Sequence, residues 1–192
     1  ELLGTVIPTS YFQSVNAVAI VIFAPVFVWV WGWLGKRKME PASPYKQSIG
    51  LFLLAIGYLV IAFGVKDIEP GTKVSMMWLI SLYTIHTFGE LALSPIGLSM
   101  VNKLSPVKFA SLLMGVWYLS MASSNIFAGM LSGLYPEPIA PGSAITHVKH
   151  FLGFEIASLY DFFMLFVVMA GASSVILFFL SGKLIKMMNG VR

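Results

Sequence analysis

One acidic side chain lies in the middle of a long apolar segment of this sequence. Glu90 is preceded by His86 and followed by Ser94, within a segment that extends from about residue 75 to residue 101. Residues four apart share one face of an α-helix, so these three side chains would project together. A carboxyl group at membrane depth is costly and by default marks a substrate or proton site. Glu90 and His86 are therefore candidates for proton-linked chemistry. The alternative is a neutral acid and a core histidine, each hydrogen-bonded to a neighbouring helix.

Two other apolar segments carry polar or aromatic side chains at positions where a membrane helix would bury them. Asn16 follows the start of the first segment, and its amide can both donate and accept hydrogen bonds. Trp117 and Ser120 lie on the fourth segment at a spacing of three, which puts them on one helical face. Each of these residues could line a cavity or serve only to pack helices together. The candidate binding residues are Asn16, Glu90, Ser94, Trp117 and Ser120.

The sequence lacks the residues that a disulfide, a metal site or a catalytic acid pair would need. The sequence contains no cysteine, which excludes disulfides, thiolate metal ligands and a cysteine nucleophile. No second acid lies near Glu90, and there is no cluster with metal-ligand spacing. We therefore expect no metal, no cofactor and no enzymatic activity. An intramembrane enzyme that uses His86 and Glu90 as acid and base is a weaker alternative, as is a scaffold without transport activity.

The composition shows which elements must position these residues. Of the 192 residues, 58% are hydrophobic and 10% are charged, whereas soluble domains carry about 25% charged residues. This excludes an ordinary cytosolic enzyme and also a disordered chain. A membrane-spanning helix needs about 20 apolar residues, and five segments qualify, so we expect an all-α membrane protein with strand only between residues 136 and 157. The expected spans are residues 10–35, 49–65, 75–101, 109–135 and 158–180.

The basic residues predict how these spans are oriented. Nine of the 12 Lys and Arg residues fall in the loops after spans one and three and in the tail after span five, against three on the other side. Cytoplasmic loops carry the excess of positive charge, so the carboxyl terminus should be cytoplasmic. The net charge of +4 is thus attributed to topology and not to nucleic-acid binding. The cluster at residues 36–38 has three charges, fewer than the four to eight usual for anionic-lipid recognition.

Small residues and prolines predict how the spans pack. Gly50, Gly57 and Gly64 recur every seven residues, which would form a groove along the second span. Pro25 and Pro95 lie inside spans one and three, where each removes one helical hydrogen bond.

Three segments together resemble a known transporter family. The run FGELALSPIGLSMVNKL at residues 88–104 is similar to the signature of the proton-dependent oligopeptide transporters, which belong to the major facilitator superfamily. The run YFQSVN at residues 11–16 resembles the start of that family's eighth helix, and MGVWYL at residues 114–119 its eleventh. The resemblance extends over the whole chain, in order and with the expected loops.

This resemblance implies a fold, an activity and roles for several residues. The chain would be helices eight to twelve of a twelve-helix fold, a partial carboxyl-terminal bundle over residues 1–192. The family imports di- and tripeptides across the cytoplasmic membrane by symport with protons. Glu90 would face the peptide amino terminus, Asn16 would help to hold it, and Trp117 would form a wall of the cavity. Ser94 would complete an acid-and-serine pair with Glu90.

The resemblance also implies that other parts of the transporter precede this chain. The family's Glu-x-x-Glu-Arg motif and its receptors for the peptide carboxylate do not occur here, so we expect Glu1 to lie inside a larger protein. The expected partners are a peptide, protons, the lipid bilayer and the missing amino-terminal half. A transporter of another small solute, such as nitrate or a modified amino acid, is the alternative within transport.

Overall fold

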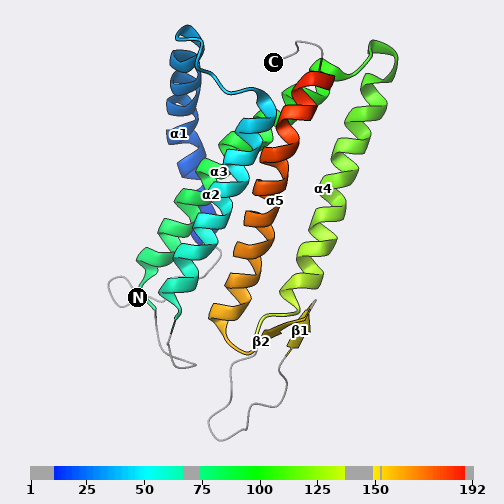
Figure 1. Cartoon of the computed structure of the whole chain (residues 1–192). Helices are drawn as coiled ribbons and strands as arrows, with labels where there is room; N and C mark the ends of the chain where they lie inside the picture. Colours follow the sequence, from blue (N-terminus) through cyan, green and yellow to red (C-terminus); the bar gives the residue numbers. More distant parts are fainter. Residues whose placement is uncertain (1–10, 67–73, 137–148, 152, 189–192) are drawn as a thin grey trace, which may run out of the picture.

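In the computed structural model, the described part of the chain forms five long helices and one short hairpin (Figure 1). The structure describes residues 11–66, 74–136, 149–151 and 153–188, with side chains from residue 14 onward. The elements are α1 (Tyr11–Lys36), α2 (Ser43–Gly64), α3 (Met76–Leu104), a 3₁₀ turn (Val107–Phe109), α4 (Ala110–Ser132), β1 (Lys149–Phe151), β2 (Phe154–Ile156) and α5 (Leu159–Met187).

The expected all-α architecture is confirmed for the described residues. The antiparallel β1–β2 hairpin falls inside the stretch where strand was expected, and residues 137–148 of that stretch lie outside the described part. By length and apolarity three described helices could cross a membrane: Ser14–Lys36, Ser43–Gly64 and Leu159–Met187. Helices α3 and α4 contain more polar side chains, among them Glu90, His86 and several serines.

Helix α2 begins earlier than its apolar stretch predicts, at Ser43 and not near Ile49. Pro44 occupies the first turn, where its missing N–H costs nothing and its fixed φ favours the helix. The helix buries Lys46, whose ammonium is paired with Glu40 and lies 4.7 Å from the ring centroid of Trp31. A lysine inside a helix interrupts an apolar pattern, so hydropathy alone places the start too late.

The glycines of α2 form a groove that receives α3, as their spacing predicted. A Cβ added to Gly50 would lie 2.8 Å from the carbonyl oxygen of Gly89, and one added to Gly57 would lie 2.3 Å from His86 Cδ2. At Gly64 the same addition would meet the Trp78 ring at 2.6 Å. The close approach of α2 and α3 therefore depends on the absence of side chains at these three positions.

On its other side α2 packs against α5 through two buried serines. The Ser48 hydroxyl donates to the Ser174 carbonyl at 2.9 Å, and the Ser174 hydroxyl donates to the Ser48 carbonyl at 2.9 Å. Ser48 is 3% exposed and Ser174 is 5% exposed. Because each hydroxyl finds its acceptor on the partner helix, the pair fixes the register of α2 and α5.

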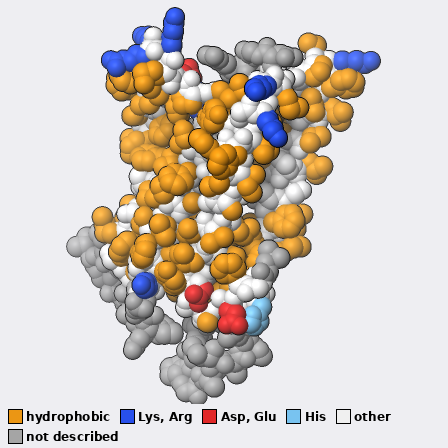
Figure 2. All heavy atoms as spheres, in the orientation of Figure 1, with side chains coloured by type: hydrophobic (Ala, Val, Ile, Leu, Met, Phe, Trp, Pro, Cys, Tyr) orange, Lys and Arg blue, Asp and Glu red, His pale blue; other side chains and the backbone are white. Residues whose placement is uncertain are grey.

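Helix α4 stands apart from this layer and is held mainly at its ends. None of its side chains is buried among the described residues, and Trp117 contacts α3 at Gly97. At the other end Lys149 of the hairpin donates to the carbonyls of Gly133 and Tyr135, at 2.9 and 3.0 Å. Figure 2 shows apolar side chains across the middle of the molecule, with most of the visible Lys and Arg at the end where α1 finishes.

Candidate substrate site between α1 and α3

The predicted pair Asn16 and Glu90 is joined by a hydrogen bond between α1 and α3. Asn16 Nδ2 donates to Glu90 Oε2 at 3.1 Å, across 74 residues of sequence. Both side chains are partly buried. An amide and a carboxyl group, each with further hydrogen-bonding capacity, thus lie side by side on facing helices.

A third residue, Thr87, completes this cluster. Its hydroxyl is a donor to Asn16 Oδ1 and is also 2.8 Å from the carbonyl oxygen of Tyr83, one turn earlier. Thr87 is fully buried, at 0% exposure. In this arrangement Asn16 Oδ1 accepts from Thr87 and Nδ2 faces Glu90, which suits an ionised carboxylate because such a group can only accept hydrogen bonds. We name Asn16, Thr87 and Glu90 the polar triad.

Aromatic packing holds the two helices in the register that the polar triad needs. Phe88 of α3 makes an edge-on contact with Phe23, with ring centroids 4.7 Å apart, and a tilted contact with Phe27 at 5.8 Å. Such pairs contribute about 0.5–1.5 kcal/mol beyond the apolar area they bury. These contacts lie beside the triad and fix the distance between α1 and α3 there.

His86 does not join this cluster, although its spacing from Glu90 predicted a shared face. Its Nε2 is 3.2 Å from the Leu54 carbonyl oxygen on α2, and its ring contacts Tyr58 with centroids 4.5 Å apart. Positions four apart differ by about 40° around a helix, since the repeat is 3.6 residues. That rotation turns His86 toward α2 and Glu90 toward α1. His86 is therefore a half-buried residue of the α2–α3 contact, with its ring nitrogen at the Leu54 carbonyl.

The other predicted binding residues lie near the polar triad or farther along α3. Ser94 is exposed, one turn beyond Glu90. A Cβ added to Gly97 would be 2.5 Å from Trp117 Cη2, which puts the indole about 10 Å along α3 from Glu90. Ser120 is exposed and its hydroxyl donates to the Trp117 carbonyl at 2.6 Å. The structure thus joins Asn16 and Glu90 directly, and brings α4 to the same helix two turns away.

Sequence reasoning missed Thr87, although a signal for it was present. Thr87 precedes Glu90 by three residues, which is a same-face spacing, and a threonine in an apolar span needs a hydrogen-bond partner. Within the described residues no group of three or more potential metal-ligating side chains occurs.

A bundle of long apolar helices with a partly buried amide–carboxyl pair between two of them is an arrangement typical of membrane transporters. A profile of the POT family matches residues 1–148 of the chain. The chain belongs to the POT family, which confirms the resemblance found in its sequence.

Relatives and solved structures agree with this assignment. The chain is 38% identical over 134 residues to the peptide transporter YePEPT of Yersinia enterocolitica, and 32% identical over 137 residues to dipeptide and tripeptide permease A of Proteus mirabilis. The matches cover 69% and 71% of this chain but only 26% and 28% of those proteins. The crystal structure of a mutant of peptide transporter POT in complex with alafosfalin superposes with a TM-score of 0.79 at 30% identity, covering 99% of this chain and 35% of that one. The chain therefore spans about a quarter to a third of the length of these proteins.

Proposed function

We propose that the chain is the carboxyl-terminal part of a proton-coupled symporter of di- and tripeptides in the cytoplasmic membrane. The observation that carries this proposal is the hydrogen bond between Asn16 and Glu90, which joins two facing helices of a POT-family bundle. Two relatives are named a peptide transporter and a dipeptide and tripeptide permease, which supports a peptide substrate. The proton gradient supplies the energy, and no other cofactor is needed.

In this proposal Glu90 binds the amino terminus of the peptide. An ammonium group next to the Glu90 carboxylate forms a charge-assisted hydrogen bond, which is stronger than a neutral one. Asn16 adds an amide contact, and Thr87 keeps that amide correctly turned.

The remaining candidate residues have supporting roles in this proposal. Beyond Glu90, the cavity wall that this chain contributes is formed by Ser94, Trp117 and Ser120. His86 stabilises the α2–α3 contact and lies outside the proton path. The wall opposite comes from the amino-terminal half of the same transporter.

The distribution of charge supports one orientation. Lys and Arg residues lie in the last turns of α1, α3 and α5 and in the segments after them, so the carboxyl ends of these three helices would face the cytoplasm. Lys73 and Arg192, which enter this comparison, lie outside the described residues. The chain would then be a multi-pass protein with a cytoplasmic carboxyl terminus.

Of the alternatives, a POT-family transporter of another small solute remains the second candidate, because this family assignment alone does not specify the solute. The alternative of an intramembrane enzyme loses its acid–base pair, since His86 turns toward α2 and Glu90 toward α1.

Substitution of Glu90 tests the proposal. In the complete transporter reconstituted in liposomes, Glu90→Gln keeps the shape but removes the charge. We expect proton-driven uptake of a labelled dipeptide and its binding to weaken by roughly ten- to a hundredfold, since hydrogen bonds to charged groups contribute about 1.5–3 kcal/mol. Glu155→Gln, at an exposed acid of the hairpin, is the matched control and should behave as the native protein.

Peptides with a blocked amino terminus make the test specific. They should lose affinity for the native transporter much more than for Glu90→Gln, because only the native protein has a charge for the ammonium group. Equal losses for both proteins would show that Glu90 does not bind the amino terminus. Uptake of a non-peptide solute with no response to peptides would instead favour the second candidate.

A further inference from the structure

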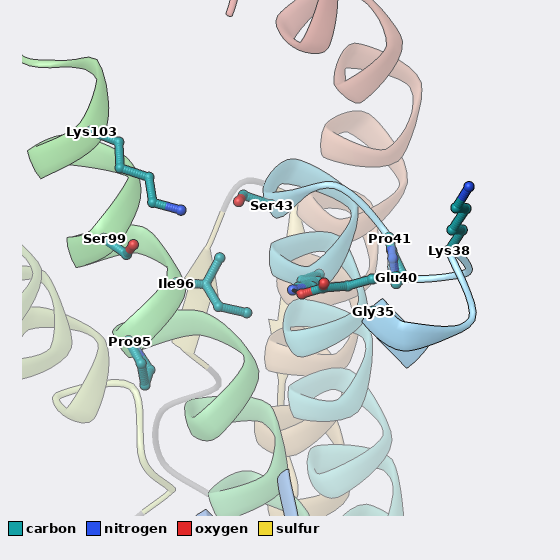
Figure 3. A pocket seen from close by; sticks show the side chains of 10 residues that line it. Gly35, Lys38, Glu40, Pro41, Ser43, Pro95, Ile96, Ser99 and Lys103 are labelled. Carbon is teal, nitrogen blue, oxygen red and sulfur yellow. Dashed lines mark hydrogen bonds and ion pairs between the residues drawn. The ribbon is translucent and has the colours of Figure 1, made fainter. Parts of the chain in front are cut away.

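One face of α3 carries both Glu90 and Gly97. The two positions are seven residues apart, a spacing that returns a helix to within about 20° of the same direction and advances it by about 10 Å. Helix α3 continues through Pro95 between them, and Figure 3 shows Pro95, Ser99 and Lys103 on successive turns of this helix. A group that covers Gly97 therefore lies on the same face as the Glu90 carboxyl group, two turns farther along.

The Trp117 indole of α4 covers this face at Gly97. A Cβ added to Gly97 would be 2.5 Å from Trp117 Cη2 and 3.2 Å from Cζ2, so the indole occupies the space that a side chain at this position would take. Gly97 is buried and Trp117 is half-buried, whereas Ser94 and Pro95, which lie between Glu90 and Gly97, are exposed. The indole thus closes the far end of an open stretch of α3.

The surroundings of Gly97 decide which group would yield to a side chain there. The same added Cβ would be 3.2 Å from Gln47 Nε2, so α2 also borders this position. Helix α3 is held in place because it packs closely on the glycines of α2. Helix α4 buries no side chain within the described residues, so its indole moves more easily than α2 or α3. A side chain at position 97 would therefore displace the indole away from α3.

The distance between Glu90 and this contact matches the length of a short peptide. An extended chain spans at most about 3.3–3.6 Å per residue, so a dipeptide spans about 7 Å and a tripeptide about 10 Å. The indole is about 10 Å from Glu90 along α3. A tripeptide that is bound at Glu90 by its amino terminus and runs along α3 would therefore end at the indole, whereas a dipeptide would end before it.

We propose that Gly97 is a positioning residue that sets the length of the peptide the site accepts, because it lets the Trp117 indole lie directly on α3. This rests on the proposed function, since it requires a peptide whose amino terminus is bound by Glu90. Gly97 acts only through Trp117 and makes no contact with the substrate of its own.

The substitution Gly97→Ala tests this in the complete transporter reconstituted in liposomes, with labelled dialanine and trialanine as substrates. The displaced indole shortens the space in front of Glu90, so the KM for trialanine should rise about tenfold, in the range that one extra methylene group costs in a fitted pocket. The KM for dialanine should change by less than about twofold, because a dipeptide ends before the indole. A loss of folded protein would instead lower the maximal rate for both peptides and leave the ratio of the two KM values unchanged.

Gly182→Ala is the matched control, because its added Cβ would meet the Tyr45 hydroxyl at 3.9 Å, an ordinary contact. Both KM values should then equal those of the native protein. Trp117→Phe provides a second test, since a phenyl ring lacks Cη2 and Cζ2. In the double variant of Gly97→Ala with Trp117→Phe, the KM ratio should return to within about twofold of its value in Trp117→Phe alone, as expected for two residues that act through one contact.

Three results would overturn the proposal. Gly97→Ala could raise both KM values equally, it could leave both unchanged, or the double variant could keep the full loss for trialanine. Uptake of the two peptides by the native protein is measured first. If the native protein transports neither peptide, the proposed function itself is contradicted and the role of Gly97 with it, whereas any of the three results with normal native uptake contradicts only the role of Gly97.

Discussion

At the scale of single residues, the orientation of one amide decides what the candidate site offers to a substrate. Asn16 could present either its oxygen or its nitrogen to Glu90, and the two choices have opposite electrostatic consequences. In the structure Thr87 donates to Oδ1 and Nδ2 faces the carboxyl group, so that each end of the amide has a partner. Thr87 is fully buried and is a positioning residue that acts through Asn16.

Removal of the Thr87 hydroxyl should therefore weaken peptide binding without any loss of a direct substrate contact. Thr87→Val preserves the shape but leaves Asn16 Oδ1 without its donor, so the amide is free to turn. We expect the Kd for a dipeptide to rise about tenfold, since a lost hydrogen bond to a buried group costs about 1–3 kcal/mol. Binding is measured on the complete transporter in detergent.

Thr87→Ser is the control, because it keeps the hydroxyl and removes only a methyl group. It should bind the dipeptide nearly as well as the native protein. If Val and Ser at this position weaken binding equally, the role of Thr87 is packing and not the orientation of Asn16.

At the scale of secondary structure, the glycines of α2 decide how closely α3 can approach. The three glycines at seven-residue spacing face three different parts of α3: the backbone at Gly89, the His86 ring and the Trp78 ring. The same contact turns His86 toward α2, where it is bonded to the Leu54 carbonyl. The position of Glu90 opposite Asn16 thus depends on the α2–α3 contact as well as on α1.

A methyl group at Gly57 should disturb this contact. Its Cβ would lie 2.3 Å from His86 Cδ2, so α3 or the imidazole has to move. We expect Gly57→Ala to destabilise the transporter by about 1–3 kcal/mol, the usual cost of overpacking. The free energy of unfolding is measured in detergent, with heat or denaturant used to unfold the protein.

Gly171→Ala is the matched control, because the same methyl group would meet Ala55 at 4.0 Å, an ordinary contact. It should be neutral or slightly stabilising, since alanine favours a helix over glycine. In the double variant with His86→Ala, much of the loss caused by Gly57→Ala should disappear. A full loss in the double variant would show that His86 is not the obstacle.

At the scale of the whole molecule, the described part of the chain is a bundle with its Lys and Arg residues near the two ends and an open side along α4. Helix α4 buries no side chain within the described residues and is held by Trp117 at one end and Lys149 at the other. The match covers about a quarter of the length of the curated relative from Yersinia enterocolitica.

The charge distribution makes the orientation in the membrane testable by cysteine labelling. This segment contains no native cysteine, so single cysteines can be introduced where needed, with any in the rest of the transporter replaced. We expect Glu155→Cys in the hairpin to react with a membrane-impermeant maleimide in intact cells. Lys183→Cys near the end of α5 should react only after permeabilisation. The reverse pattern would contradict the proposed orientation.

The class of protein, its helices and the two residues at the centre of the candidate site all follow from the amino-acid sequence alone. Long apolar segments admit only helices in a membrane, and a lone carboxyl group in such a segment stands out because its burial is costly. An amide near the start of the first segment stands out for a similar reason, so Asn16 and Glu90 are both recognisable by residue type and position. The seven-residue spacing of glycines on α2 likewise predicts a groove, since it depends on one helix only.

The packing of the bundle decides which neighbouring helix lies opposite each of these residues. Periodicity gives the direction of a side chain around its own helix, but it does not say which neighbour lies in that direction. His86 and Glu90 therefore look alike in the sequence and diverge in the fold, while Thr87 gains its role through contact with α1. Lys46 interrupts an apolar pattern, yet it is buried because Glu40 and Trp31 come together around its ammonium group. The energy of such polar groups depends on partners distant in the chain, and only the packed bundle brings those partners together.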